Sequence, residues 1–209
     1  PLVAGSPGPI DLCNIVASLT DANFAGGSFI IEQGMAQGEM AAATYTVAAA
    51  EWPIKINLTE VILAQQTTMN TTTQWSLLFY QGNPQTGTLV QTFTADDVVL
   101  PYARIPAGTN GINIQFSIDP QDPEQLIIQD NGTHQFSVAF RIDHHNDQTA
   151  DPCIISPPGN SNAFPCVDVS GLQNSANNRL FGVNCGPFGC PANGGWATFA
   201  ALPTFCRPS

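Results

Sequence analysis

Hydrophobic residues recur at every second position in the most regular segments of this chain. In GINIQFSI, residues 111–118, they are Ile112, Ile114, Phe116 and Ile118. In HQFSVAFRI, residues 134–142, they are Phe136, Val138, Phe140 and Ile142. Because successive side chains of a strand point to opposite faces, this spacing predicts strands that pack one face on a core.

Two further segments depart from simple alternation. PIKINLTEVIL, residues 53–63, places Ile54, Ile56 and Leu58 on one face and then shifts parity at Val61 and Leu63. A shift of this kind predicts a β-bulge. In QWSLLFY, residues 74–80, apolar side chains fall on both faces of the expected strand. One face has Trp75, Leu77 and Phe79, and the other has Leu78 and Tyr80. This predicts a strand that is covered on both sides.

Turn residues separate these segments from further short strand candidates, which are SFIIEQ, ATYTVA, TLVQTF, DVVLPY, CVDV, NRLFGV and GWATFA. QDNG, residues 129–132, predicts a hairpin between residues 126–128 and the strand that starts at His134. The nearest approach to a helix is GMAQGEMAAA, which its glycines weaken. The pattern predicts an all-β fold, an antiparallel β-sandwich or jelly roll.

The chain is expected to form one domain over residues 11–209, preceded by an extended Pro/Gly-rich arm over residues 1–10. Between Asp151 and Gly195 the sequence is rich in Pro, Gly, Asn and Cys, which predicts long loops pinned by disulfides. Loops on a rigid sheet scaffold are where binding sites are usually placed.

The cysteines are even in number, and none of them has C-x-x-C zinc spacing. Three disulfides are expected, although six cysteines allow fifteen connectivities. Proximity favours Cys185 with Cys190 and Cys153 with Cys166, which leaves Cys13 with Cys206 to join the two ends of the domain. Disulfides indicate an oxidising, extracellular compartment.

Charge is scarce and mostly negative. Charged residues make up 10% of the chain and its formal net charge is −11. The few cations are scattered singly, so the composition argues against nucleic acid and against anionic membrane surfaces as partners. No apolar run is long enough to span a bilayer, and the start at Pro1 is that expected of a mature exported chain. Three sequons, at Asn57, Asn70 and Asn131, are candidate glycosylation sites.

The segments GMAQGEMAAATYTV, EWPIKINLTEVIL and GWATFAAL carry a resemblance. They resemble a group of uncharacterised secreted bacterial β-sandwich domains, with a GxAxGE segment and a Trp-rich C-terminal motif. The resemblance implies a secreted β-sandwich and no particular activity. In that group the last motif is followed by a final strand, which this chain lacks because it stops at Ser209.

One polar stretch, RIDHHNDQTADPC, combines imidazoles and carboxylates in a way that suits a metal. Its candidate ligands are Asp143, His144, His145, Asp147 and Asp151. The alternative is that the strand ends near Ile142 and the stretch is a solvated turn. A second acidic stretch, DPQDPE, offers oxygen ligands for Ca²⁺ from Asp119, Asp122 and Glu124, with Asp96 and Asp97 as a similar case. No cofactor is required by the sequence.

Catalytic motifs are missing from the sequence. There is no Gly-x-Ser-x-Gly elbow, P-loop or dinucleotide fingerprint, so no catalytic residue is assigned. Aromatic residues at loop–strand junctions are candidates for glycan contact, with Trp52 and Trp196 ahead of Trp75, Tyr80 and Tyr102. For each of them a place in the core is the alternative.

The leading expectation is therefore a secreted, non-enzymatic structural or adhesive module. A carbohydrate-binding module is the first alternative and a metal-dependent hydrolase the second. Self-association is also expected, because a sandwich without its last strand exposes an edge that the arm Pro1–Ile10 of a neighbouring subunit can fill. If such a contact does not close into a ring, it forms a filament.

Overall fold

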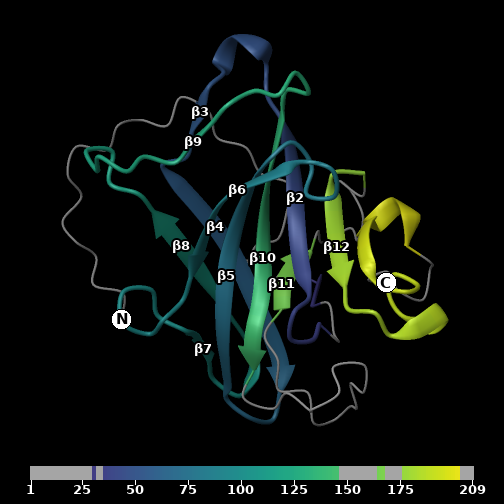
Figure 1. The fold of residues 1–209 in the computed structure, drawn as a ribbon. Helices are drawn as coiled ribbons and strands as arrows, with labels where there is room; N and C mark the ends of the chain where they lie inside the picture. Colours follow the sequence, from purple (N-terminus) through teal and green to yellow (C-terminus); the bar gives the residue numbers. More distant parts are fainter. Residues whose placement is uncertain (1–29, 32–34, 146–163, 168–175, 203–209) are drawn as a thin grey trace.

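The computed structural model describes residues 30–31, 35–145, 164–167 and 176–202 (Figure 1). The predicted arm over residues 1–10 and part of the predicted C-terminal loop region lie outside these residues. All strand pairings of the described residues are antiparallel, and the helical elements among them are three-residue 3-10 turns: η1 Ala49–Glu51, η2 Gly186–Phe188 and η3 Phe199–Ala201. The all-β antiparallel prediction is confirmed.

The larger sheet has seven strands. Its order is β13 (Gly195–Thr198), β12 (Asn178–Gly182), β2 (Met40–Thr46), β10 (Gln135–His145), β5 (Thr71–Gln81) and β6 (Thr88–Thr94), with β7 (Ala103–Ile105) also paired to β5. The long strands β5 and β10 form its centre, and Figure 1 shows them side by side.

The smaller sheet has four strands in the order β1 (Ile30–Ile31), β11 (Phe164–Val167), β4 (Leu58–Thr67) and β8 (Gly108–Ser117). A separate pair joins β3 (Ile54–Lys55) to β9 (Ile127–Ile128). In Figure 1 β4 and β8 pass behind the seven-stranded sheet. Whether this arrangement belongs to the sandwich or jelly-roll class stays a prediction.

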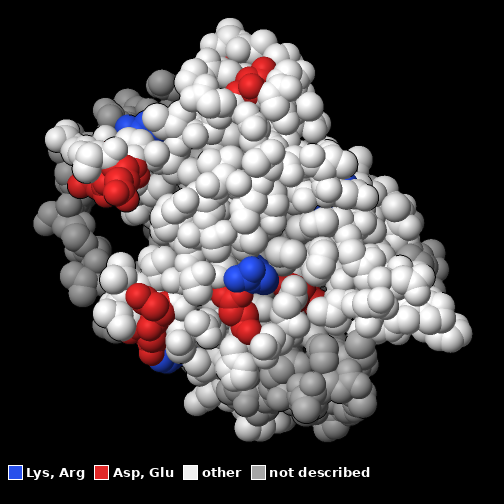
Figure 2. All heavy atoms as spheres, viewed as in Figure 1, with Lys and Arg blue, Asp and Glu red and all other residues white. Residues whose placement is uncertain are grey.

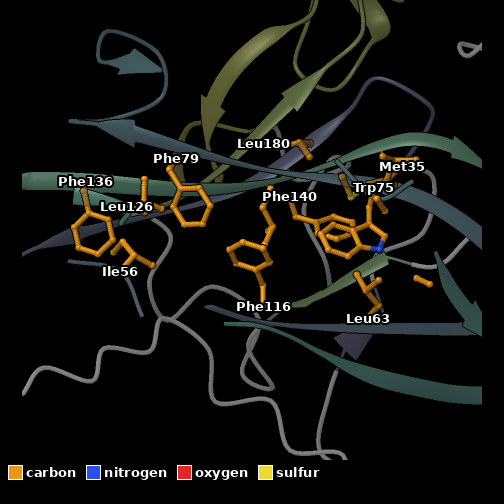
Figure 3. Packing of buried hydrophobic residues seen from close by; sticks show 14 of the residues in the cluster. Met35, Ile56, Leu63, Trp75, Phe79, Phe116, Leu126, Phe136, Phe140 and Leu180 are labelled. Atoms are coloured by element: carbon orange, nitrogen blue, oxygen red, sulfur yellow. The ribbon is translucent and has the colours of Figure 1, made fainter. Parts of the chain in front are cut away.

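One hydrophobic cluster receives side chains from both sheets. Trp75 and Phe79 of β5 and Phe140 of β10 meet Leu63 of β4 and Phe116 of β8 (Figure 3). The apolar residues at every second position of the segments 111–118 and 134–142 all belong to this cluster or pack against it. The predicted alternation is therefore confirmed for both strands. Burial of this apolar surface is the main force that holds the sheets together.

The prediction for β5 is also confirmed. Trp75, Leu77 and Phe79 are buried in the cluster between the sheets, whereas Leu78 and Tyr80 are buried in a second cluster on the opposite face. We call that opposite face of the seven-stranded sheet the outer face. A strand in the middle of a sheet that is apolar on both sides requires cover on both sides.

Three local predictions are wrong. The parity shift after Leu58 reflects a break between β3 and β4, and Leu58 is exposed instead of sharing the buried face of Ile54 and Ile56. Residues 126–128 do not form a hairpin with β10, because β9 pairs with β3. DVVLPY is a loop and not a strand, since carboxylates of the loop bind its own backbone N–H groups.

That loop, residues 95–102, leaves one edge of the sheet and returns to it. It starts where the Ala95 N–H donates to the Trp75 carbonyl, 2.8 Å, and ends where the Trp75 indole N–H donates to the Pro101 carbonyl, 3.1 Å. β6 ends opposite Ser76 and β7 begins opposite Thr73. Only two residues of β5 lie between the partners of the two loop ends. Eight loop residues are too many to follow the edge over that distance, so the loop projects from this edge.

Candidate functional site

A row of side chains crosses the outer face of the seven-stranded sheet. The row runs through directly opposed residues of six neighbouring strands, which are Trp196, Phe181, Met40, Arg141, Ser76 and Thr94. Side chains of directly opposed residues lie on the same face of a sheet, about 4.8 Å apart along the row. The row therefore spans about 24 Å.

The polar part of the row is a hydrogen-bonded cluster. The Arg141 Nε donates to Asp143 Oδ1 at 2.5 Å, and the Ser76 hydroxyl donates to Asp143 Oδ2 at 2.5 Å. Ser76 Oγ also lies 3.3 Å from Arg141 Nη2 and 2.8 Å from Thr94 Oγ1. Charge-assisted bonds of this kind hold a guanidinium in one orientation.

The cluster suits recognition better than catalysis. Ser76 is fully buried and its hydroxyl is engaged by its neighbours, so it is not an accessible nucleophile. The Arg141 side chain is 35% exposed and Asp143 only 15%. Because a guanidinium carries five N–H donors and no acceptor, the exposed part of Arg141 can offer hydrogen bonds to ligand oxygens.

The apolar part of the row lies beside this cluster. Phe181 and Trp196 make an edge-to-face contact with ring centroids 5.4 Å apart, and both pack on the cluster of Met40, Ala42, Leu78, Tyr80 and Ala139. Burial raises the pKa of the Tyr80 hydroxyl, and the charge of Arg141 opposes this shift. The outer face thus combines partly exposed aromatic rings with a fixed cation.

Figure 2 shows the same side of the molecule as Figure 1. A small group of blue and red atoms lies near its middle, and most of the remaining surface is white. Further charged groups lie at the top and at the left of this view, well apart from the central one, in agreement with the low charged content of the chain.

The strand β10 does not end at Ile142, which corrects the prediction of a solvated turn there. It continues to His145 through a β-bulge between Ile142 and His144. His144 is opposite Gln74 and His145 is opposite Thr73. The His144 Nδ1 lies 3.1 Å from Gln37 Oε1, whereas Asp143 binds Arg141 and Ser76.

The proposed metal ligands are not gathered by the part of the chain that the structure describes. No group of three or more His, Cys, Asp or Glu side chains within it is arranged to hold a metal. Asp147 and Asp151 lie outside the described residues. A metal at this stretch therefore stays a prediction, and Asp143 has a structural partner instead.

The acidic loop after β8 is organised by its own backbone. Asp119 Oδ1 accepts the Gln121 N–H at 2.9 Å, and Asp122 Oδ1 accepts the Glu124 N–H at 2.8 Å. These are the local turns typical of Asp. The Asp119, Asp122 and Glu124 side chains are exposed but do not converge on one point as a metal group. Calcium binding here remains a prediction.

The two tryptophans that the sequence proposed for glycan contact differ in position. Trp52 packs against the core between the sheets, 6.4 Å from the Phe136 ring, and its indole N–H donates to the Val47 carbonyl. Trp196 is on the outer face, in the row described above. The structure thus separates the pair, and only Trp196 lies beside Phe181 and in the same row as Arg141.

The segment GMAQGE has a structural explanation. Gly38 has φ of +92°, a conformation that favours glycine, and the next residue turns its side chain back into the protein. The buried Glu39 carboxylate accepts the Ala36 N–H at 2.7 Å and the Val183 N–H at 3.3 Å. Burial raises its pKa, and these two hydrogen bonds oppose the shift. Glu39 therefore joins the start of β2 to the end of β12.

The remaining predicted sites are partly described. Cys185 and Cys190 are disulfide-bonded, and their pairing with each other stays a prediction. Cys166 lies in β11 opposite Ile31, and Cys13, Cys153 and Cys206 lie outside the described residues. Of the sequon residues, Asn70 and Asn131 are exposed, whereas Asn57 is partly buried.

Sequence reasoning missed Arg141, Ser76, Phe181 and Met40 as members of one surface. Part of the signal is present, because Ser137, Ala139, Arg141 and Asp143 form the second parity of β10. The order of the strands was not available from that parity. Only the register brings β12 and β13 next to β2 and completes the row.

The described residues include no helix long and apolar enough to cross a bilayer. No protein-family model, no curated protein and no solved structure matches the chain.

Proposed function

We propose that this chain is an exported, non-catalytic β-sandwich that serves as a structural or adhesive module outside the cell. Its contact surface is the outer face of the seven-stranded sheet. The observation that carries the proposal is the row from Trp196 to Thr94, in which aromatic rings and a fixed guanidinium share one face. The predicted disulfide framework supports an oxidising compartment.

The acidic loops support a non-catalytic role. Asp96, Asp119 and Asp122 each bind backbone N–H groups of their own loop, as expected of side chains that shape turns. Ser76 and Asp143 are occupied in the Arg141 cluster. The polar groups described so far thus have roles in shape and orientation.

Carbohydrate is the ligand chemistry that the outer face favours. A pyranose ring can pack its C–H face on Trp196 and Phe181 by dispersion contacts. The hydroxyl groups of a further sugar unit in the same polysaccharide can then bond to Arg141 and Asp143, because Arg141 is about 10 Å from Phe181 across the strand of Met40. Because the aromatic rings and Arg141 are this far apart, an extended polysaccharide fits the row better than a small free sugar.

A retention assay tests this function. Beads coated with the purified protein are passed over surfaces that carry defined polysaccharides and glycoproteins. The test variant is Arg141→Ala with Trp196→Ala, and the matched control is Lys55→Ala with Phe188→Ala, which removes the same kinds of side chain elsewhere. We expect retention of the parent and the control and its loss in the test variant.

The opposite results are equally clear. Retention of all three proteins, or of none on any surface, contradicts the proposed contact face. Thermal melting of each variant ensures that loss of retention is not loss of fold. The metal-dependent hydrolase alternative is tested separately by elemental analysis of the purified protein, where a bound transition metal would support it.

A further inference from the structure

One edge of the seven-stranded sheet, as the described residues form it, suggests how copies of this chain associate. β6, Thr88–Thr94, is the last strand in the order of the seven-stranded sheet, and β5 is its partner among the described strands. An edge strand has one row of backbone N–H and C=O groups that its own sheet does not use. Proteins usually protect such strands with charges, prolines or a short length.

β6 has little of this protection. Its sequence TLVQTFT contains no charged residue, proline or glycine, and β-branched and aromatic residues favour the extended conformation. A bulge at Val90 interrupts its pairing with β5, but Gln91 to Thr94 pair regularly with Phe79 to Ser76. The side chains of Leu89 and Val90 are 48% and 39% exposed.

The other edge strands differ from β6. β13 is only four residues long. β8 is longer, but it includes Gly108 and Gly111, and its Asn113 and Gln115 amides bond to the charged Glu60 of β4. β6 is thus the edge strand of the described residues that combines length with an uncharged, apolar surface.

The loop after β6 extends this apolar edge. Asp96 Oδ1 accepts the N–H groups of Val98, Val99 and Leu100 at 2.8 to 3.1 Å, so the carboxylate is turned toward its own loop. Asp97 binds Arg104 in a two-pronged ion pair. The tip of the loop consequently presents Val98 and Val99, which are 87% and 79% exposed.

The distribution of charge along the chain favours a second copy of the chain as the partner of β6. The whole chain carries a net charge of −11, so two copies repel each other over most approaches. Residues 61–95, which include β5, the following turn and β6, contain no Asp, Glu, Lys or Arg. Two copies can therefore meet along this edge with little repulsion, whereas a basic partner finds no charge there to recognise.

We propose that β6 pairs antiparallel with β6 of a second copy of this chain, about a two-fold axis. The pairing joins two seven-stranded sheets into one continuous sheet and buries Leu89, Val90, Val98 and Val99 between the copies. A two-fold contact places the same surface on both subunits, so it closes as a dimer. This contact gives the proposed structural role a means of assembly and, in that sense, rests on it.

The dimer differs from association through residues 1–10, because it uses a strand that is already in the sheet. It also does not use Arg141 or Trp196, although Leu89, opposite Tyr80, lies on the outer face. Each proposal can therefore fail alone: retention on polysaccharide depends on Arg141 and Trp196, and association of purified protein in solution depends on β6.

Analytical ultracentrifugation of the purified full chain over a wide concentration range tests the contact. We expect the parent to be a dimer whose fraction falls on dilution. Leu89→Lys with Gln91→Lys places two cations on the edge and is expected to halve the observed mass. The control, Leu58→Lys with Ile127→Lys, makes the same charge change at equally exposed sites elsewhere and should remain dimeric.

A monomeric parent at every concentration, or a β6 variant that remains dimeric, overturns the proposal, and so does equal dissociation of the control. Hydrogen exchange of the parent provides a measurement that needs no variant. The amides of Thr88–Thr94 should exchange more slowly at high protein concentration than at low concentration. Exchange of these amides that does not depend on concentration contradicts the pairing.

Discussion

The ring of Phe93, on edge strand β6, lies with its centroid 4.5 Å from that of Phe116, on edge strand β8. The two residues come from different sheets, and both rings also contact Phe79 of β5. This group of three phenylalanines closes one side of the core between the sheets. Aromatic pairs at such distances contribute beyond the apolar area that they bury.

Phe93→Ala is therefore expected to destabilise the fold by about 3 kcal/mol, near the low end for Phe→Ala because the ring is only partly buried. Urea unfolding followed by tryptophan fluorescence measures the change. Phe188→Ala, at a ring that is exposed in η2, serves as the control and should leave the unfolding midpoint unchanged. Equal effects of the two substitutions would show that the phenylalanine group does not join the sheets.

Glu39 predicts a dependence of stability on pH. Its pKa is raised by burial from 4.5, so the folded state binds more protons than the unfolded state above that value. Stability from this residue therefore falls as the pH rises through 4.5 and through the raised folded value. The free energy of unfolding of the parent, measured relative to Glu39→Gln at several pH values, should decrease over that range.

A Glu39→Ala substitution removes both acceptor oxygens and leaves the Ala36 and Val183 N–H groups without them. The expected cost is about 1–3 kcal/mol, the usual penalty for losing the partner of a buried donor. Glu51→Ala, at an exposed residue of η1, is the control. A parent-like midpoint for Glu39→Ala would mean that the carboxylate does not hold β2 to β12.

Asp97 predicts a change of stability with pH that is opposite in sign to that of Glu39. The hydrogen bonds from Arg104 lower its pKa from 3.8 to about 2, so its ionised form is favoured in the folded state. The stability that it gives is present above 3.8 and is lost as the pH falls through about 2. Limited proteolysis at acid pH with pepsin should therefore cut residues 95–102 increasingly as the pH falls. In Asp97→Asn the cutting should already be present at pH 4 and change little below it.

Gly182 allows the chain before Pro191 to approach β12 closely. A Cβ placed on this glycine would lie 2.3 Å from the Cys190 carbonyl oxygen. Gly182→Ala is expected to cost about 1–3 kcal/mol, as overpacking does elsewhere, and to lower the melting temperature. A Cβ added at Gly132 would meet open space, so the cost of Gly132→Ala comes only from the positive φ of this residue. A smaller loss of stability is therefore expected for Gly132→Ala.

Non-reducing peptide mapping tests the cysteine prediction. The expected linked peptides contain Cys185 with Cys190, Cys153 with Cys166, and Cys13 with Cys206. A map in which Cys185 and Cys190 are linked to other cysteines would overturn the pairing by proximity. Free thiols at all six positions would contradict the extracellular compartment.

Much of the fold was predictable because alternation reports which side chains face a core. The residues around Trp75, Phe116 and Phe140 all follow that rule. The rule failed where local chemistry decided instead. Asp96 supplies a carboxylate that bonds to the N–H groups of Val98 and Val99, and so these β-branched residues form a turn despite their preference for strands.

The candidate site was less predictable than the fold. Arg141 and Trp196 are 55 positions apart in sequence, and nothing in either local pattern indicates the other. They share a row only because β12 pairs with β2 and β13 pairs with β12. Long-range strand order is set by the summed packing of the whole core, which a single sequence does not reveal segment by segment.

The loop of residues 95–102 has a consequence for how this protein can change. Its shape is fixed by Asp96, Asp97 and Arg104, whereas the side chains of Val98 and Val99 contribute little to holding it. Substitution at these two positions can therefore alter what the edge contacts without altering the scaffold. A lineage could exchange one partner for another here, and a protein engineer could display a short peptide at the same place.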